Sequence, residues 1–204
     1  MSRTRLPADE RRASLLACAC GIFSGGSYRG STTAEIARQA GVTEPVLYRH
    51  FQSKRDLYLA CIDETWRHIR ALWDEVVAAE PDAAAWVPAM GQAYLAATEQ
   101  KMAIGNLWIQ ALSEASEDEV IREHMRTHLR EVHDYVSDVI RRSQAAGGVL
   151  PDRDADAEAW IFLSLGLLLV ASDRLGGFLE AETPAVFASR RRWLTGLAEG
   201  RPPS

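Results

Sequence analysis

The chain has 204 residues, of which 47% are hydrophobic and 25% charged, an ordinary composition for a soluble globular protein. Its formal net charge of −5 excludes a chain that is basic throughout. The charge is unevenly distributed, however, because residues 1–60 contain nine Lys and Arg against five Asp and Glu, whereas residues 61–204 contain 14 against 23. We therefore expect a basic, DNA-facing module on an acidic body.

The first helix is predicted over residues 7–24. Pro7 suits a first helical position, and Asp9 and Glu10 suit the positive end of the helix dipole. The arginines in and before this helix either reach phosphates or form a solvated face, and the sequence leaves both interpretations open for Arg3, Arg5, Arg11 and Arg12. An apolar stripe at helical spacing is expected to cover the helices that follow, and it consists of Leu15, Leu16, Ala19, Ile22 and Phe23.

The stretch 30–54 reads as two short helices joined by a tight turn. Thr32 and Glu35 have the spacing of a capping box at the start of the first helix. Gly41 follows its end, where a left-handed backbone is common. Thr43 is placed to cap the second helix, and Pro45 falls in its first turn, where a missing N–H costs little.

The second short helix has one buried stripe and one free face. Leu47 and Phe51 are four residues apart and form the buried stripe. The remaining faces carry Glu44, Pro45, Val46, Tyr48, Arg49 and His50. A helical hairpin with this layout is typical of a helix-turn-helix, whose second helix enters the major groove of DNA.

The combined motif resembles the tetracycline-repressor (TetR) family of bacterial transcriptional regulators, over roughly residues 15–62. Pro45 departs from the pattern, since many members have Gly there. The resemblance implies a DNA-binding domain over residues 1–53 and a ligand-binding and dimerisation domain over 54–204. It is carried by Thr32-Thr33, Ile36-Ala37, Ala40-Gly41-Val42, Leu47-Tyr48-Arg49-His50-Phe51 and Lys54.

The predicted DNA contacts divide by their chemistry. Tyr48, His50 and Lys54 offer a hydroxyl, an imidazole and an ammonium for phosphates, and Lys54 begins the next helix, where free N–H groups attract phosphate. Base readout is assigned to other side chains of the second helix. The full predicted set is Thr33, Thr43, Glu44, Pro45, Val46, Tyr48, Arg49, His50 and Lys54.

The remainder is predicted to be all-α. A long helix over residues 54–79 connects the DNA module to the body, and helices follow over 82–98, 104–114, 118–146, 152–174 and 184–199. The apolar run 159–171 is too short to span a bilayer at 13 residues, so no membrane partner is expected. The resemblance implies that the last two helices pair with those of a second subunit, and we predict interface residues Trp160, Leu165, Leu168, Leu169, Phe187, Trp193 and Leu194.

The body is rich in aromatic residues. Each alone is most simply a core residue, but together they suggest an apolar pocket. In the TetR family such a pocket binds a small molecule that alters DNA affinity, and here we expect an apolar or aromatic effector. The predicted lining residues are Trp66, Trp73, Trp86, Met90, Tyr94 and Trp108.

Other chemistry is sparse. His124 and His128 are four residues apart and His133 is near, but interleaved arginines favour a mixed, solvated face over a metal site. We find no coherent catalytic set, and we predict neither a metal nor a cofactor. Two other readings stay open: an enzyme on an all-α body, and an interaction protein that keeps a helix-turn-helix.

The sequence also favours a location in the cytoplasm. Leu15 to Cys18 resembles a lipoprotein cleavage site, but the residues before it are polar and lack the apolar core of a signal peptide. The three cysteines, Cys18, Cys20 and Cys61, are expected to be reduced thiols in the core of a cytosolic protein. The interpretation that these patterns favour is a homodimeric, ligand-responsive transcriptional regulator that binds operator DNA, most simply as a repressor.

Overall fold

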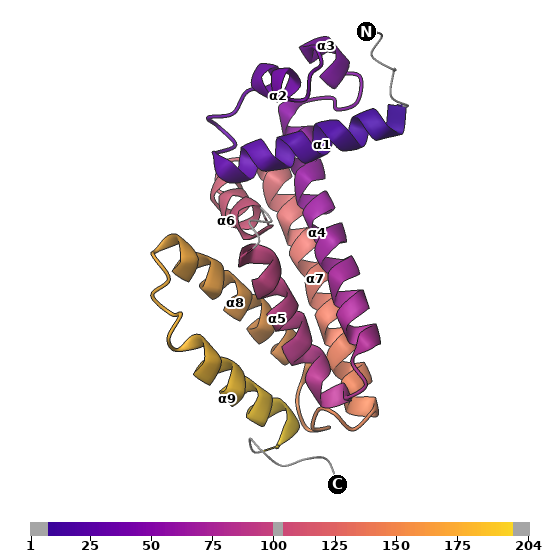
Figure 1. Ribbon diagram of the computed structural model, residues 1–204, viewed down its shortest axis with the longest axis vertical. Helices are drawn as coiled ribbons and strands as arrows, with labels where there is room; N and C mark the ends of the chain where they lie inside the picture. The colour runs from indigo at the N-terminus through magenta and orange to yellow at the C-terminus, as the bar shows by residue number, and fades with distance from the viewer. Residues whose placement is uncertain (1–7, 100–103, 198–204) are drawn as a thin grey trace. The chain divides into compact units, whose positions relative to one another are not determined.

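The structure is a computed structural model that describes residues 8–99 and 104–197, and over these ranges it consists of helices and their connections (Figure 1). The all-α prediction is confirmed. In chain order the helices are α1 (Ala8–Gly25), α2 (Thr33–Gln39), α3 (Glu44–Leu47), α4 (Lys54–Ala79), a 3-10 turn (Ala83–Ala85), α5 (Trp86–Glu99), α6 (Ile104–Glu114), α7 (Glu119–Ala145), α8 (Ala155–Arg174) and α9 (Thr183–Thr195).

The described residues form two compact units. The first comprises residues 8–68 and 104–127, and the second comprises 69–99 and 128–197. The first unit thus contains α1, α2, α3, α6 and the first part of α4 and of α7. Helices α4 and α7 are continuous and contribute residues to both units.

The core of the first unit confirms the predicted role of the first helix. Its stripe residues Leu15, Ala19 and Phe23 are fully buried, and they belong to one apolar cluster with Ile36 and Leu47. Burying each such side chain contributes roughly 1.5–3 kcal/mol. Helix α1 therefore fixes α2 and α3 by covering their apolar faces.

Several helix boundaries differ from the predicted ones because of local capping. Helix α8 begins at Ala155 rather than 152, since the Asp154 carboxylate accepts the N–H groups of Asp156 and Ala157 at 3.0 and 3.1 Å. Helix α9 ends at Thr195 rather than 199, because Gly196 takes a left-handed backbone with φ 69°.

In the second unit, Trp73 of α4 packs between two helices. Its ring stacks on Tyr135 of α7 at 5.8 Å and meets Phe162 of α8 edge-on at 5.6 Å. Its indole N–H donates to the carbonyl of Met90 at 3.0 Å. Helices α8 and α9 run side by side in opposite directions (Figure 1), and the N–H of Leu150, just before α8, donates to the carbonyl of Leu194 near the end of α9 at 2.8 Å.

Helix α8 corrects one step of the sequence argument. The apolar run has 13 residues, but the helix that contains it has 20 and is long and apolar enough, by length and composition, to cross a membrane. Only 33% of its apolar window is buried within the chain. Length therefore does not exclude a membrane span, although a single such helix is weak support for one, since core helices of soluble proteins pass the same test.

The cysteines are free thiols. Cys61 is fully buried in the core of the first unit, whereas Cys18 and Cys20 are half-buried. Burial raises the pKa of the Cys61 thiol, which keeps it protonated. The core assignment thus holds fully for Cys61 and only in part for the two cysteines of α1.

Candidate nucleic-acid interface

Helices α2 and α3 are joined by the predicted tight turn. The Thr32 hydroxyl accepts the N–H of Glu35 at 3.1 Å and so caps α2. Gly41 has φ 68°, a left-handed conformation in which a side chain would be strained. The N–H of Val42 then donates to the carbonyl of Ala37 at 2.9 Å, which closes the turn and starts the chain toward α3.

Helix α3 is shorter than predicted. It spans only Glu44–Leu47, with Pro45 in its first turn, and residues 48–50 continue as hydrogen-bonded turns. Leu47 and Phe51 are nevertheless both buried, because the N–H of Phe51 still reaches the carbonyl of Leu47 at 3.1 Å. Thr43 occupies the N-cap position, but its side chain makes no capping hydrogen bond, contrary to the prediction.

A polar cluster joins the two helices. The hydroxyl of Thr33 in α2 donates to the carboxylate of Glu44 in α3, and it lies 3.1 Å from the hydroxyl of Tyr48. Because the Thr33 proton points to Glu44, the Tyr48 hydroxyl is the donor to Thr33. Thr33 is only 7% exposed. Thr33 and Glu44, both predicted as DNA contacts, therefore hold the helix-turn-helix together.

The free face of this motif consists of the other predicted residues. Thr43, Pro45, Tyr48 and Arg49 are exposed, whereas Val46 and His50 are half-buried. Tyr48 is anchored through its hydroxyl and is nevertheless 46% exposed. This face combines a guanidinium and an imidazole, which are donors suited to phosphates and base edges, whereas the Tyr48 hydroxyl already donates its hydrogen to Thr33.

Lys54 is the first residue of α4, and the start of this helix is well capped. The hydroxyl of Ser53 accepts the N–H of Asp56 at 3.0 Å, and the Asp56 carboxylate accepts the N–H of Gln52 at 2.9 Å. The Lys54 ammonium lies 4.6 Å from the centroid of the Tyr28 ring. Burial lowers the pKa of Lys54 and the nearby Glu114 carboxylate opposes that shift.

Tyr28 was not predicted as a functional residue. It lies in the loop before α2, and its ring packs against Tyr58 at 4.6 Å and Phe23 at 6.1 Å. A lone tyrosine in a glycine-rich loop carries no periodic signal, so only the fold reveals that it supports Lys54.

Several arginines of the first unit already have partners. Arg29 pairs with Glu114 and Glu117, and Arg55 lies 3.0 Å from Asp118. The Arg12 guanidinium lies 4.9 Å above the ring of Phe51. Arg12 therefore has a packing role that neither of the two predicted alternatives, phosphate contact or a solvated face, included. Arg3 and Arg5 lie outside the described residues.

The predicted ligand residues divide between the two units. Trp66 and Trp108 belong to the first, whereas the other four belong to the second. Trp73 and Met90 are buried and joined by a hydrogen bond. The Trp86 indole donates to the carbonyl of Glu80 at 2.9 Å, which ties down the connection after α4.

The predicted interface residues are mostly accessible. Trp160, Leu168 and Trp193 are 41%, 46% and 50% exposed, and Leu165, Leu169 and Phe187 are half-buried. Leu194 is the exception. At 4% exposure it packs inside its own unit, so the sequence prediction places it on the wrong side of α9.

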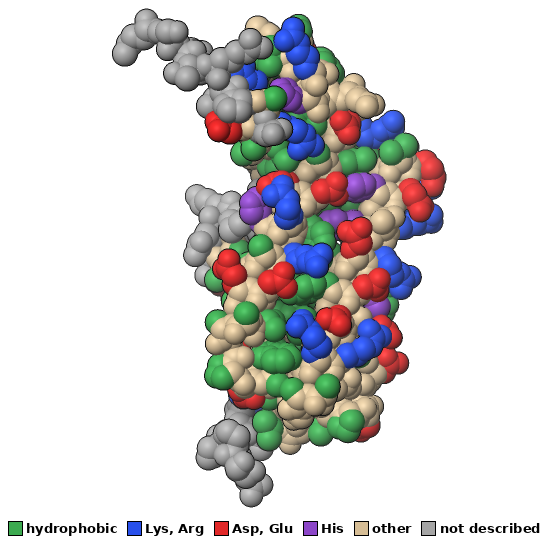
Figure 2. Space-filling model, turned by 90° about the vertical axis from the view of Figure 1, so that its right-hand side faces the viewer, with side chains coloured by type: hydrophobic (Ala, Val, Ile, Leu, Met, Phe, Trp, Pro, Cys, Tyr) green, Lys and Arg blue, Asp and Glu red, His purple; other side chains and the backbone are tan. Residues whose placement is uncertain are grey.

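The histidines of α7 have local partners. His124 lies 2.7 Å from the Asp63 carboxylate, and His133 lies 2.9 Å from that of Asp134 while its ring stacks on Trp160. Nowhere in residues 8–99 and 104–197 do three or more His, Cys, Asp or Glu side chains gather as a metal ion would require. Basic and acidic side chains are interspersed over the face drawn in Figure 2, the mixed pattern that the sequence suggested.

The fold and the site define a helix-turn-helix regulator of transcription with a helical C-terminal body. The model of the bacterial regulatory proteins of the tetR family matches residues 15–61, and that of the BetI-type transcriptional repressor C-terminal domain matches residues 83–167. The chain therefore belongs to the TetR family of DNA-binding transcriptional regulators.

Individual relatives agree with this membership. The transcriptional activator FasR of Mycolicibacterium smegmatis is 49% identical over 65 residues, which cover 32% of this chain and 28% of FasR. The nucleoid occlusion factor SlmA of Shewanella sediminis is 23% identical over 176 residues, 86% of each chain. A TetR-family regulator from Rhodococcus sp. superposes with a TM-score of 0.81 over 92% of this chain and 99% of that one, at 18% identity.

Proposed function

We propose that this chain is a homodimeric transcriptional repressor that binds a near-palindromic operator and is released by a small apolar or aromatic effector. The observation that supports DNA contact is the exposure of Tyr48 and Arg49 in the turns that directly follow α3, together with Lys54 at the first position of α4. The match to the BetI-type repressor body supports repression, whereas FasR carries the name of an activator.

The division of labour within the interface follows from the contacts. Lys54 and His50 are assigned to phosphates, because each offers hydrogen-bond donors but lacks the planar pair of donors with which arginine recognises a base edge. Arg49 is assigned to a base edge, since an exposed guanidinium next to α3 can bind a guanine in a bidentate manner. Thr33 and Glu44 position the two helices rather than touch DNA. Residues 1–53 act as the DNA-binding domain and 54–204 as the regulatory one.

Dimerisation is supported by the apolar surface that α8 and α9 leave uncovered. Trp160, Leu168 and Trp193 are large side chains that the single chain does not bury. A partner that covers them would also explain why α8 is so apolar while only a third of its window is buried. Two helix-turn-helix motifs on a two-fold axis imply half-sites about one helical turn, or a multiple, apart.

Release by an effector is assigned to α4. This helix is continuous from Lys54 to Ala79, so residues 54–68 belong to the first unit and residues 69–79 to the second. A ligand against Trp73 and Tyr94 would act on the same helix that carries Lys54. In this account the dimer has a second state in which its two helix-turn-helix motifs no longer fit adjacent major grooves. A ligand that binds this state a hundredfold more tightly would shift the equilibrium between the two states by about 2.7 kcal/mol. By linkage, operator DNA would weaken ligand binding by the same factor.

In the first experiment the full chain selects the duplexes that it binds from a pool of DNA of random sequence. We expect an enriched near-palindrome, and loss of preference at one base pair, worth about 1–3 kcal/mol, on Arg49→Ala. A reporter carrying the selected site upstream of a promoter then separates repression from activation. Enrichment of no sequence by a folded, dimeric protein would refute the function, and reporter output that rises with the regulator would refute repression.

A further inference from the structure

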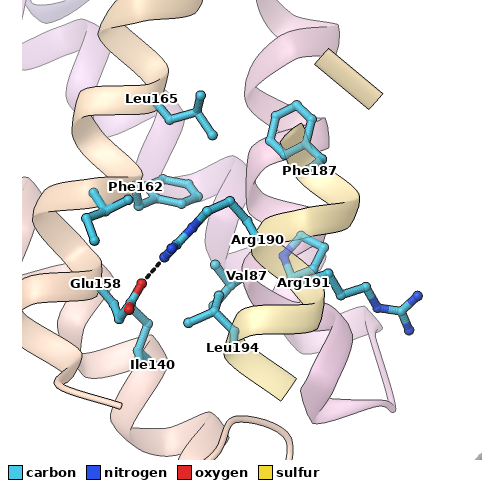
Figure 3. A pocket seen from close by; sticks show the side chains of 11 residues that line it. Val87, Ile140, Glu158, Phe162, Leu165, Phe187, Arg190, Arg191 and Leu194 are labelled. Atoms are coloured by element: carbon cyan, nitrogen blue, oxygen red, sulfur yellow. Dashed lines mark hydrogen bonds and ion pairs between the residues drawn. The ribbon is translucent and has the colours of Figure 1, made fainter. Parts of the chain in front are cut away.

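A pocket in the second unit joins apolar walls to a single half-buried guanidinium. Val87 of α5, Ile140 of α7 and Phe162 and Leu165 of α8 line it, and Phe187 of α9 faces them (Figure 3). Gly91 of α5 allows the Phe187 ring to approach α5, because a Cβ there would lie 3.3 Å from that ring. The pocket contains none of the aromatic residues predicted to bind the effector.

The polar atoms of this pocket are unequally satisfied. Glu158 is 6% exposed, and one of its oxygens accepts from Arg190 while the other accepts from the Trp193 indole at 2.7 Å. Arg190 has five N–H hydrogens, and Glu158 is its partner among the described residues. Its side chain remains 27% exposed, and burial lowers its pKa. The guanidinium therefore has donors left for a further acceptor at an open edge of the pocket.

We propose that this pocket, a partly open cavity of about 40 Å³, binds one end of a medium-chain carboxylic acid, with the carboxylate on the free hydrogens of Arg190, the first carbons of the chain against Phe162, Leu165 and Phe187, and the rest of the chain outside the cavity. Arginine binds carboxylates through charge-assisted hydrogen bonds, which are strongest where water is scarce. This site differs from the one proposed above against Trp73 and Tyr94, and its ligand carries a charge. Its regulatory meaning rests on the proposed effector response, but binding to the site itself is independent of DNA.

The polar side chains of the pocket, Glu158 and Arg190, favour an anionic ligand over a cationic one. A ligand ammonium would need Glu158, whose two oxygens already accept hydrogen bonds from Arg190 and Trp193. A neutral alcohol would gain the apolar walls but only one weak acceptor for Arg190. A dianionic headgroup would place two charges against one guanidinium that Glu158 partly neutralises. A singly charged carboxylate matches the remaining donors.

The experiment measures binding of octanoate, octan-1-ol and octylammonium to the full chain by isothermal titration calorimetry, without DNA. We expect octanoate to bind at least about tenfold tighter than octanol, and octylammonium to bind most weakly. Octylammonium tighter than octanoate would assign the pocket to cations and overturn the proposal. Equal affinity for octanoate and octanol, or no binding of octanoate, would overturn it as well.

Two neighbouring arginines of α9 provide the matched variants. Arg190→Gln should weaken the binding of octanoate at least about tenfold and leave the affinity for octanol unchanged. Arg191 also lines the pocket, but its guanidinium points away from the cavity (Figure 3), so Arg191→Gln should change neither affinity. Circular dichroism and gel filtration confirm that each variant is folded. If both variants weaken octanoate equally, Arg190 is not the anion site.

Glu158→Gln adds a test with the opposite sign. It keeps the side-chain shape, removes the negative charge beside Arg190 and replaces one of the two acceptor oxygens by an amide NH2 group, so octanoate should bind several-fold tighter than to the unmodified chain. Tighter binding supports the site, and unchanged or weaker binding by the folded variant contradicts it. Octanoate that binds through Arg190 without altering operator affinity would sustain the carboxylate site and refute only its role as effector.

Discussion

The ammonium of Lys54 lies 4.6 Å from the centroid of the Tyr28 ring. This contact joins the start of α4 to the loop before α2, within the first unit. A cation over an aromatic face gains about 0.5–1 kcal/mol at a partly exposed site. Tyr28 therefore holds a long, flexible side chain at the first turn of a helix, where a phosphate would meet both the ammonium and free backbone N–H groups.

Removing the ammonium tests this placement. Lys54→Ala should weaken binding to all duplexes alike and reduce the slope of log affinity against log salt by about one, because one counterion fewer is released. Gel shifts at several salt concentrations measure the slope. Arg67→Ala, an exposed arginine later in α4 that pairs with Glu64, is the control and should leave it unchanged. A folded Lys54→Ala protein with the original slope would exclude Lys54 from the phosphate contacts.

The polar cluster at Thr33 predicts a stability difference between two threonines. Thr33→Val removes the donor to Glu44 and leaves Tyr48 without its acceptor, so it should lower the free energy of unfolding by about 1–3 kcal/mol. Thr43→Val should stay within about 0.5 kcal/mol, because that side chain is exposed and makes no capping hydrogen bond. Urea denaturation compares the two. Equal costs would show that the cluster does not stabilise the motif.

The uncovered surface of α8 predicts the assembly. Leu168→Glu should yield monomers or insoluble protein, because a partner that covers this 46% exposed side chain would bury an unpaired charge. Val120→Glu, in α7 and 47% exposed, should leave the assembly unchanged. Leu165→Glu is less informative because Leu165 also lines the pocket that contains Arg190. Sedimentation or light scattering gives the mass, and a Leu168→Glu variant that stays a soluble dimer would place the interface elsewhere.

Tyr94 predicts a loss of stability at high pH. Burial raises the pKa of its phenol from 10.0 to about 12. The folded state therefore holds the proton more tightly than the unfolded state, so the contribution is complete below pH 10 and is lost as pH rises toward 12. By about pH 11 the loss should be about 1.4 kcal/mol.

Tyr94→Phe provides the comparison, since it keeps the ring and removes the titrating group. Urea denaturation at about pH 9, 10 and 11 should show the variant losing about 1.4 kcal/mol less than the unmodified chain over this range. The difference in tyrosinate absorbance between the two proteins gives the pKa of Tyr94, because the other four of the five tyrosines are common to both. Identical pH dependence in the two proteins would mean that Tyr94 titrates as an ordinary exposed phenol.

The sequence by itself determined the class of the fold and most helices. The period of apolar residues, the glycine at 41 and the proline after α4 act locally, so the ends of α4 and α6 agree with the prediction. The family was likewise evident from one contiguous motif, because a helix-turn-helix is built from residues close in the chain.

Tertiary structure decided which polar residues of that motif face solvent and which hold it together. Thr33 and Glu44 carry the same chemistry as a phosphate or base contact, and only the approach of α2 to α3 turns them toward each other. Tyr28 and Lys54 are 26 positions apart, and Glu158 and Arg190 are 32 apart. Such pairs leave no periodic signal, since they depend on how whole helices pack, and packing is set by the shape of every buried side chain at once.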